Sequence, residues 1–188
     1  MSETIRTFIA FELPDDLLAD LNHLQSGFKK YGLPAKWVRP ESIHLTLKFL
    51  GNLEVTQIDS VARKMIDAAR GHGPLSLRAE GVGVFPHIRR PRVLWAGLAG
   101  AVKGLSDLQH SIDVALSEIG FHREKRSFKG HLTLGRFKTR PDSQQMQHAL
   151  KEYAEFETES FSADKIILFK SELNPGGAIY SKLKHVAL

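Results

Sequence analysis

The tetrapeptide His-Leu-Thr-Leu occurs twice in the chain, at residues 44–47 and again at residues 131–134. Histidine and threonine two residues apart in an extended strand point to the same face of that strand. An imidazole can give or take a proton near neutral pH, and a hydroxyl can donate a hydrogen bond to an anionic oxygen. One such stretch alone is typical of any half-buried strand. Because both copies keep the scarce histidine in the same register, we predict that His44 and His131 form a paired acid–base site.

Strand alternation also predicts which side chains of the first copy enter the core. Leu45, Leu47 and Phe49 are expected on one face of the strand, and His44 and Thr46 on the other. The second copy has the same pattern. We therefore expect each strand to carry one apolar face covered by helices and one polar face available for chemistry.

Hydrophobic periodicity and turn residues predict alternating strands and helices around these motifs. Strands are expected at the His131 motif and at residues 4–13, 37–38, 43–50, 75–85, 92–98, 161–173 and 178–186. Helices are expected at residues 14–28, 55–69, 102–119 and 143–154. Two turn signals, Gly51-Asn52 and Asn174-Pro175-Gly176-Gly177, are expected to end the first histidine strand and to form the last hairpin.

The second half of this plan repeats the first, with one His-x-Thr strand in each half. We predict an α+β fold, namely a bilobal duplicated α/β fold with two mainly antiparallel sheets facing a central cleft and helices on the outside. Residues 1–188 are expected to form a single two-lobed domain. Approximate twofold symmetry would bring the two histidine strands together at the cleft.

The composition is that of an ordinary globular protein. Of the 188 residues, 42% are hydrophobic, and no run of about 18 apolar residues is available to span a membrane. The first residues lack the basic-then-apolar order of a secretion signal, so we expect a cytoplasmic protein. The absence of cysteine excludes disulfides, thiolate nucleophiles and cysteine-bound zinc.

The formal net charge of +5 favours an anionic partner, and the distribution of the cations is more informative than their sum. Arg89, Arg90 and Arg92 surround Pro91. A second basic group precedes His131 and consists of Arg123, Lys125, Arg126 and Lys129. Because a basic loop beside a histidine strand suits a phosphate-bearing substrate, we expect a nucleotide or RNA as the partner.

Five segments, in order along the chain, resemble those of one enzyme family. The first segment is residues 6–10 with Leu13-Pro14, and the second is Trp37-Val38 with Pro40-Glu41 and residues 44–51. The third is Phe85-Pro86 with residues 90–95, and the fourth is residues 128–136. The fifth consists of Ser171, Leu173, Pro175, Gly177 and Tyr180. Over nearly its whole length the chain resembles the RNA 2′,3′-cyclic phosphodiesterases of the two-histidine phosphoesterase superfamily, once described as 2′-5′ RNA ligases.

One departure from the family pattern lies directly before the second histidine. The family often has proline there, whereas this chain has Lys129-Gly130. Since glycine is less rigid than proline, we expect a looser start of the strand or an altered substrate contact. The histidine and threonine are intact, so we expect no loss of activity.

The resemblance implies hydrolysis of a 2′,3′-cyclic phosphate, at an RNA or nucleotide terminus, to a 2′-phosphomonoester. It implies RNA or a cyclic nucleotide as the partner and no obligate protein partner. One neutral imidazole and one imidazolium can perform both proton transfers without a metal or cofactor, each transfer contributing about 10²–10⁴ in rate. We assign His131 as the general base for water and His44 as the general acid for O3′.

Three further side chains are expected to bind the phosphate. Thr46 and Thr133 lie two residues after the histidines, and their hydroxyls can donate hydrogen bonds to phosphate oxygens. Arg136 resembles the arginine that closes the family's second signature and would suit the charge that develops on the phosphorane. Since Arg136 is five residues from His131, simple alternation turns it to the opposite face, and its role requires a bulge near Gly135.

Weaker candidates and rival interpretations remain open at the level of sequence. Phe11 and the Arg89–Arg92 loop are further candidates for contacts with base or backbone. A non-catalytic RNA-binding protein would explain the charge, and a metal hydrolase could use His44 and His131 as ligands, although no third ligand stands at metal-ligand spacing beside either. RNA joining would have to be independent of ATP, since the chain has no Gly-x-x-x-x-Gly-Lys loop.

Overall fold

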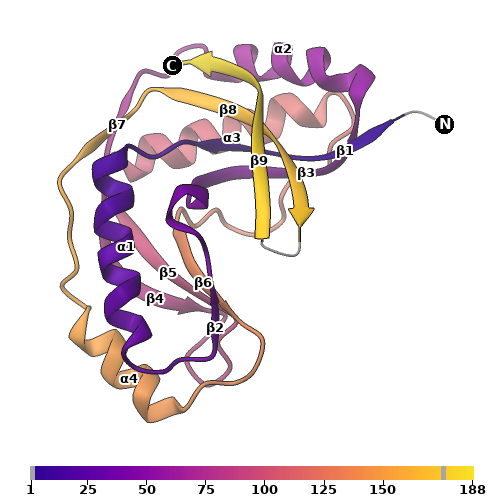
Figure 1. Cartoon of the computed structure of the whole chain (residues 1–188). Helices are drawn as coiled ribbons and strands as arrows, with labels where there is room; N and C mark the ends of the chain where they lie inside the picture. The colour runs from indigo at the N-terminus through magenta and orange to yellow at the C-terminus, as the bar shows by residue number, and fades with distance from the viewer. Residues whose placement is uncertain (1–2, 175–176) are drawn as a thin grey trace.

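A computed structural model describes residues 3–174 and 177–188, and the described chain consists of strands and helices in the order that the periodicity predicts (Figure 1). The strands are β1 (Thr4–Phe11), β2 (Ala35–Trp37), β3 (Leu45–Glu54), β4 (Leu75–Phe85), β5 (Val93–Gly100), β6 (Leu132–Phe137), β7 (Phe161–Ala163), β8 (Lys165–Asn174) and β9 (Gly177–Ala187). The helices are α1 (Asp15–Lys29), α2 (Ile58–Ala69), α3 (Val102–Ser117) and α4 (Ser143–Glu152), with short 3₁₀ turns at Pro40–Ser42 and Val55–Gln57.

The strands form one continuous sheet in the order β7-β4-β5-β6-β3-β1-β8-β9, with β2 also paired to β6. Every pairing is antiparallel, and only one residue pair, Leu45 with Leu132, joins β3 to β6. The two predicted sheets are therefore the two halves of one sheet, which run at a steep angle to one another in Figure 1. The predicted α+β class with mainly antiparallel strands is confirmed.

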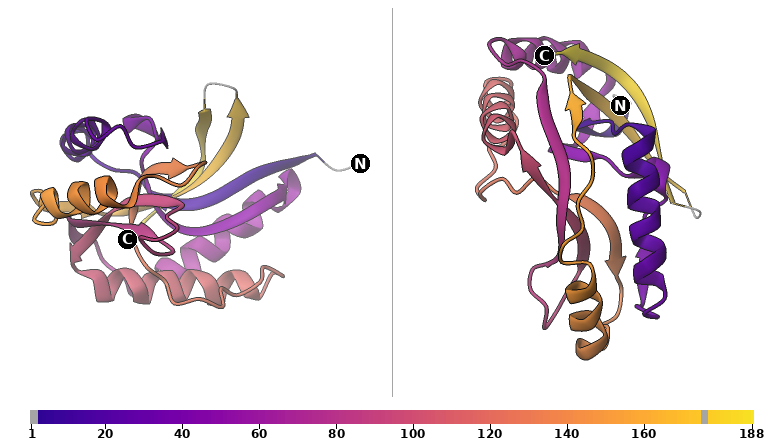
Figure 2. Two further views of the ribbon diagram at one scale, coloured as in Figure 1. Left: turned by 90° about the horizontal axis from the view of Figure 1, so that it is seen from below. Right: turned by 90° about the vertical axis from the view of Figure 1, so that its left-hand side faces the viewer.

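Helices cover one face of each half of the sheet (Figures 1 and 2). Helices α2 and α3 pack on each other and contact β9 and β3, while α1 and α4 lie along the half that contains β6. The buried residues of α1 follow helical spacing and comprise Leu17, Leu21, Leu24, Gln25, Gly27 and Phe28. Within the described ranges, no helix is long and apolar enough to cross a membrane.

Two predicted strand boundaries are wrong, for reasons of long-range pairing. The expected strand 161–173 is interrupted at Asp164, because β7 pairs with β4 in one half whereas β8 pairs with β1 and β9 in the other. The Gly51-Asn52 signal does not end β3. Gly51, at φ 74°, sits beside a bulge where β3 continues to pair with β1.

The predicted hairpin at the end of the chain is present, since β8 and β9 pair as far as Asn174 with Gly177. The middle of its turn, Pro175 and Gly176, lies outside the described residues.

Candidate active site

The single residue pair that joins the two halves of the sheet also brings the two histidine motifs together. Leu45 and Leu132, each the residue after a histidine, are partners in antiparallel register. If that register is continued by one residue on either side, His44 lies opposite Thr133 and Thr46 lies opposite His131. Both histidines stand directly before their strands rather than inside them. The leucines are fully buried, so the histidines and threonines share the other face, which we call the site face.

Each imidazole is held by its own backbone in the same way. His44 Nδ1 lies 2.9 Å from the carbonyl oxygen of Ser42, and His131 Nδ1 lies 2.7 Å from that of Lys129. Because a carbonyl oxygen can only accept, each Nδ1 must carry the hydrogen. The Nε2 atom of each neutral ring is therefore the free base, and both rings are preset in the same tautomer.

The two histidine strands contain matching bulges one residue after the threonine. Leu47 is an extra residue in β3 opposite Ile9 and Ala10 of β1, and Leu134 is an extra residue in β6 opposite β5. Alternation reverses after each bulge, so Phe49 and Arg136, each five residues after a histidine, turn to the site face. The bulge that Arg136 requires is thus present at Leu134, next to Gly135.

The predicted position of Phe49 in the core is wrong for the same reason. Its side chain is 63% exposed, and its ring lies 6.0 Å from that of Phe8 on the site face. Lys48 takes the buried position instead and is 8% exposed.

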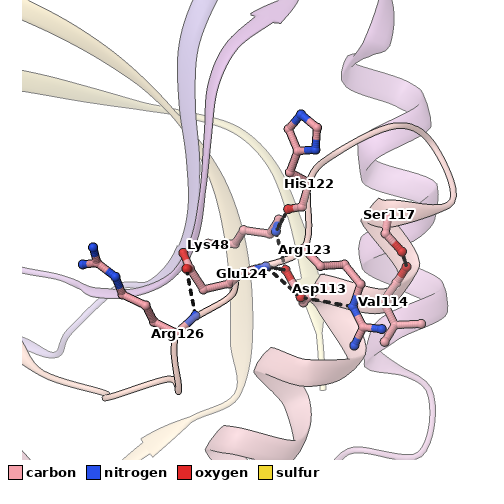
Figure 3. A network of polar contacts seen from close by, with 8 residues as sticks. All are labelled: Lys48, Asp113, Val114, Ser117, His122, Arg123, Glu124 and Arg126. Atoms are coloured by element: carbon pink, nitrogen blue, oxygen red, sulfur yellow. Dashed lines mark hydrogen bonds and ion pairs between the residues drawn. The ribbon is translucent and has the colours of Figure 1, made fainter.

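Buried Lys48 ties the first histidine strand to the segment that leads to the second histidine (Figure 3). Its Nζ pairs with Asp113 on α3 and donates to the carbonyl oxygen of His122 at 2.9 Å. The backbone N–H of Glu124 donates to both carboxylate oxygens of Asp113 at 3.2 Å. Burial raises the pKa of Asp113, but the hydrogen bonds from Lys48 and Glu124 outweigh burial and leave it below its usual value.

Gln25 of α1 holds the bulge in β6. Its Nε2 donates to the carbonyl oxygen of the bulged Leu134 at 2.7 Å and to that of Val38 at 2.8 Å. The N–H of Val38 donates to the same Leu134 oxygen at 3.0 Å. This buried amide therefore stabilises the backbone geometry that directs Arg136 to the site face.

Aromatic rings contact both imidazoles. The ring of Phe8 lies 4.6 Å from that of His44, and Tyr180 meets His44 edge-on at 5.1 Å. Phe85 meets His131 edge-on at 5.0 Å. None of these three residues was predicted as a site residue.

Comparison with known proteins identifies the family of this arrangement. The chain matches the LigT like Phosphoesterase family over residues 11–95 and 98–180, so that one histidine motif lies in each matched stretch. The chain belongs to the LigT-like phosphoesterases.

The similarity of this LigT-like phosphoesterase to its relatives extends over almost the whole chain. A protein of Methanothermobacter thermautotrophicus named RNA 2′,3′-cyclic phosphodiesterase is 32% identical over 180 residues, covering 96% of this chain and 97% of the relative. A Thermotoga maritima protein of the same name is 32% identical, with 95% and 93% covered. Among solved structures, TT0787 of Thermus thermophilus superposes with a TM-score of 0.81 at 25% identity, with 98% of each chain covered. Escherichia coli LigT complexed with 3′-AMP has a TM-score of 0.77 at 23% identity, with 99% of each covered.

Burial lowers the pKa of both histidines of the LigT-like phosphoesterase. The backbone carbonyl beside each Nδ1 opposes this effect, and the positive charge of Arg136 adds to it at both rings. The charge of His131 lowers the pKa of His44 further. Arg136 therefore stands close enough to act on both imidazoles, and it favours their neutral forms when no anion is bound.

Two groups of weaker candidates lie elsewhere in the phosphoesterase. Phe11 is 1% exposed and belongs to the main core under the helices, so it cannot stack on a base. Phe8 lies three residues before Phe11 in β1, so its side chain points to the opposite face of the strand, where it contacts His44. Arg89, Arg90 and Arg92 line a hollow of about 430 Å³ that contains neither histidine.

Gly130, directly before the second histidine, lies in close contact with Leu98 and Leu105. A Cβ atom at this position would lie 3.0 Å from Leu105 and 3.1 Å from Leu98, and its φ is outside the left-handed region. The hydrogen bond between His131 and the Lys129 carbonyl nevertheless holds the start of the strand.

Metal-ligand side chains do not gather at this site. Across residues 3–174 and 177–188, no group of three or more His, Cys, Asp or Glu side chains is arranged to hold a metal ion. The other histidines are dispersed, at positions 23, 72, 87, 110, 122, 148 and 185.

Proposed function

We propose that this phosphoesterase hydrolyses 2′,3′-cyclic phosphate ends of RNA or nucleotides to 2′-phosphomonoesters, without a metal, by paired histidine acid–base catalysis. The observation that carries the proposal is the symmetric pair of imidazoles, each with Nδ1 bound to a backbone carbonyl and Nε2 left free. The names of the relatives supply the substrate class. The expected cytoplasmic location remains a prediction.

In the proposed reaction, His131 Nε2 takes a proton from water as the water oxygen bonds to phosphorus. The bond between phosphorus and O3′ then breaks, and the imidazolium of His44 gives its Nε2 proton to O3′. The low pKa of the free imidazoles must rise for one of them to be protonated, and the negative charge of the bound phosphate raises it. The phosphate remains on O2′, and His44 and His131 exchange one proton with solvent to complete the cycle.

Thr46, Thr133 and Arg136 would hold the non-bridging oxygens. Both threonines are partly buried on the site face, and each hydroxyl can donate one hydrogen bond. The Arg136 guanidinium can donate two parallel hydrogen bonds to the oxygens as their charge increases toward the phosphorane.

The deciding experiment is the hydrolysis of a short RNA that ends in a 2′,3′-cyclic phosphate, in the presence of EDTA. We expect wild type to form the 2′-phosphate, and His44→Ala or His131→Ala to lose several orders of magnitude in turnover while staying folded. Near-wild-type turnover by either folded variant would remove the two-histidine mechanism. A 3′-phosphate product would make O2′ the leaving group, and retained RNA binding without turnover would favour a non-catalytic RNA-binding protein.

ATP-independent 2′-5′ ligation would use the same two histidines. A ribose 5′-hydroxyl would replace water as the nucleophile at the cyclic phosphate, with the same proton transfers. Incubation of a cyclic-phosphate RNA with a 5′-hydroxyl RNA, without ATP, measures this reaction directly. Loss of both joining and hydrolysis in His131→Ala is expected if the two reactions share one centre.

A further inference from the structure

A second basic region lies at the far end of β5 and β6. The loop between β4 and β5, with Arg89, Arg90 and Arg92, and the residues that follow β6, with Lys138 and Arg140, line the hollow of about 430 Å³. Figure 1 shows these two loops together at the lower end of that half of the sheet. The hollow is thus built from segments about fifty residues apart in the chain.

These five cations face solvent without carboxylate partners. All five are exposed, and within the described residues none of them forms an ion pair. The neighbouring Asp142 is engaged as the N-cap of α4, where it accepts hydrogen bonds from the N–H groups of Gln144 and Gln145 at 2.9 Å. Like charges gathered in this way repel each other, and a bound anion relieves that repulsion.

Paired strands β5 and β6 connect the hollow to the histidine site. Phe85, which contacts the His131 ring, directly precedes the basic loop, and its carbonyl accepts a hydrogen bond from the N–H of Arg92. The N–H of Phe137 donates to the Arg92 carbonyl at 2.9 Å. The four steps of β6 from Thr133 to Phe137, one of them at the bulge, rise at most about 13 Å, and Lys138 follows directly after the strand. A ligand longer than one nucleotide is needed to reach from the histidines to the hollow.

We propose that this hollow binds backbone phosphates of RNA upstream of the cyclic end, so that the enzyme favours oligonucleotides over cyclic mononucleotides. This inference rests on the function proposed for the histidine site. Guanidinium groups bind phosphate with paired hydrogen bonds, and a cyclic mononucleotide has no upstream phosphate to offer them. The cyclic phosphate is bound by the histidine site and the preceding phosphates by the hollow.

Another hollow on the molecule has the opposite character. It has a volume of about 560 Å³ and is lined by Asp20, Glu157 and Glu159, with Arg78 already paired to Glu157 at 2.9 Å. Its carboxylates repel phosphate, so charge favours the basic hollow over this one for an RNA strand.

The test compares Lys138→Gln/Arg140→Gln with a control of equal charge loss, Arg63→Gln/Lys103→Gln, on α2 and α3. Hydrolysis is measured with a hexanucleotide that ends in a 2′,3′-cyclic phosphate and with adenosine 2′,3′-cyclic monophosphate. We expect the first variant to lose at least fivefold in kcat/KM on the hexanucleotide and less than twofold on the mononucleotide. Each phosphate contact with single-stranded RNA contributes about 0.7 to the slope of log(kcat/KM) against log[salt]. With two contacts removed, the slope should therefore become shallower by about 1.4. The control should match wild type.

A parallel measurement keeps the inference independent of turnover. Fluorescence anisotropy gives the Kd of a labelled hexanucleotide that ends in a 2′-phosphate, and we expect Lys138→Gln/Arg140→Gln to weaken it at least fivefold. Equal losses on both substrates, or an unchanged Kd, would overturn the inference and leave the hollow to another polyanion, such as an acidic protein segment. Failure of wild type to hydrolyse either substrate would instead remove the proposed function, while the Kd would still decide the role of the hollow.

Discussion

Arg136 acts on both histidines through its charge, and in the proposed mechanism its guanidinium would also donate hydrogen bonds to the phosphate. A fixed positive charge disfavours an imidazolium, and Arg136 lowers the pKa of His44 and of His131. Both imidazoles are therefore neutral near pH 7 in the free protein. In the proposed mechanism, the negative charge of a bound phosphate would offset the arginine and permit one ring to be protonated.

Replacement of Arg136 should separate these two effects. In Arg136→Gln the pKa of both histidines is expected to rise, because the positive charge beside them is gone. NMR titration of the imidazoles measures that rise, and the acidic limb of the kcat/KM profile should move to higher pH. Turnover should fall about 10²-fold through the loss of a donor to the phosphorane. Arg136→Lys, which keeps the charge, should leave the titration near wild type; titration curves that coincide in all three proteins would contradict this account.

The low pKa of His44 also links stability to pH. Because its pKa in the folded state lies below that of the unfolded chain, about 6.5, its contribution is fully present above that pH and is lost as the pH falls through the folded value. Urea unfolding at pH 7.5 and pH 5.0 should therefore show a smaller loss of stability for His44→Gln than for wild type. The exposed His23→Gln is the matched control and should lose as much as wild type. An equal loss in all three would rule out this linkage.

At the level of elements, the matched bulges in β3 and β6 decide what lies beside the histidines. The same displacement turns Phe49 to the site face in one strand and Arg136 in the other. The two histidine strands are therefore alike in backbone and unlike in chemistry. One side of the site has an aromatic ring where the other has a cation.

The β6 bulge depends on Gln25, and loss of that amide should be measurable. Gln25→Met leaves the partly buried Val38 carbonyl without its hydrogen bond, which is expected to cost about 1–3 kcal/mol of unfolding free energy. Turnover should fall together with stability, because Arg136 is no longer held on the site face. Gln144→Met, an exposed glutamine, is the control for stability and turnover. Wild-type turnover in Gln25→Met would show that the bulge forms without Gln25.

The pair of Lys48 and Asp113 joins β3, α3 and the segment that leads to His131. Lys48→Met leaves the buried Asp113 carboxylate with only the exposed Arg123, 3.6 Å away, as its cation, and we expect a loss of about 3–5 kcal/mol in urea unfolding. The double variant Lys48→Met/Asp113→Leu should recover part of that loss, because the unpaired charge is gone. A single variant as stable as wild type would mean that the pair contributes little.

For the whole molecule, one hydrophobic core crosses both halves of the sheet. It contains Leu45 of one half and Leu132 and Leu94 of the other, all fully buried. The candidate active site lies where the halves meet, so each half carries only one of the two histidines. Such a core is expected to make the halves unfold together.

The two tryptophans offer a test of this cooperativity. Trp37 and Trp95 both belong to the half that contains β6, whereas far-ultraviolet circular dichroism reports on all the helices and strands. Urea transitions followed by tryptophan fluorescence and by circular dichroism should coincide. Separate midpoints would indicate that the halves unfold independently.

The repeated His-x-Thr motif and the apolar periodicity are local patterns, and they determined much of this protein. They predicted the paired histidines, the types and order of the elements, and a duplicated fold, because period-two and period-3.6 patterns are readable from neighbouring residues. The family resemblance added the expected cyclic phosphate chemistry.

Only the tertiary structure decided which way Phe49, Phe8 and Arg136 point, and that the strand expected at 161–173 divides between two halves. Each outcome depends on a partner strand that is distant in sequence. A bulge is an extra residue relative to that partner, so nothing in the alternation of one strand alone reveals it. The basic hollow has the same origin, since Arg90 and Arg140 meet only because β5 pairs with β6.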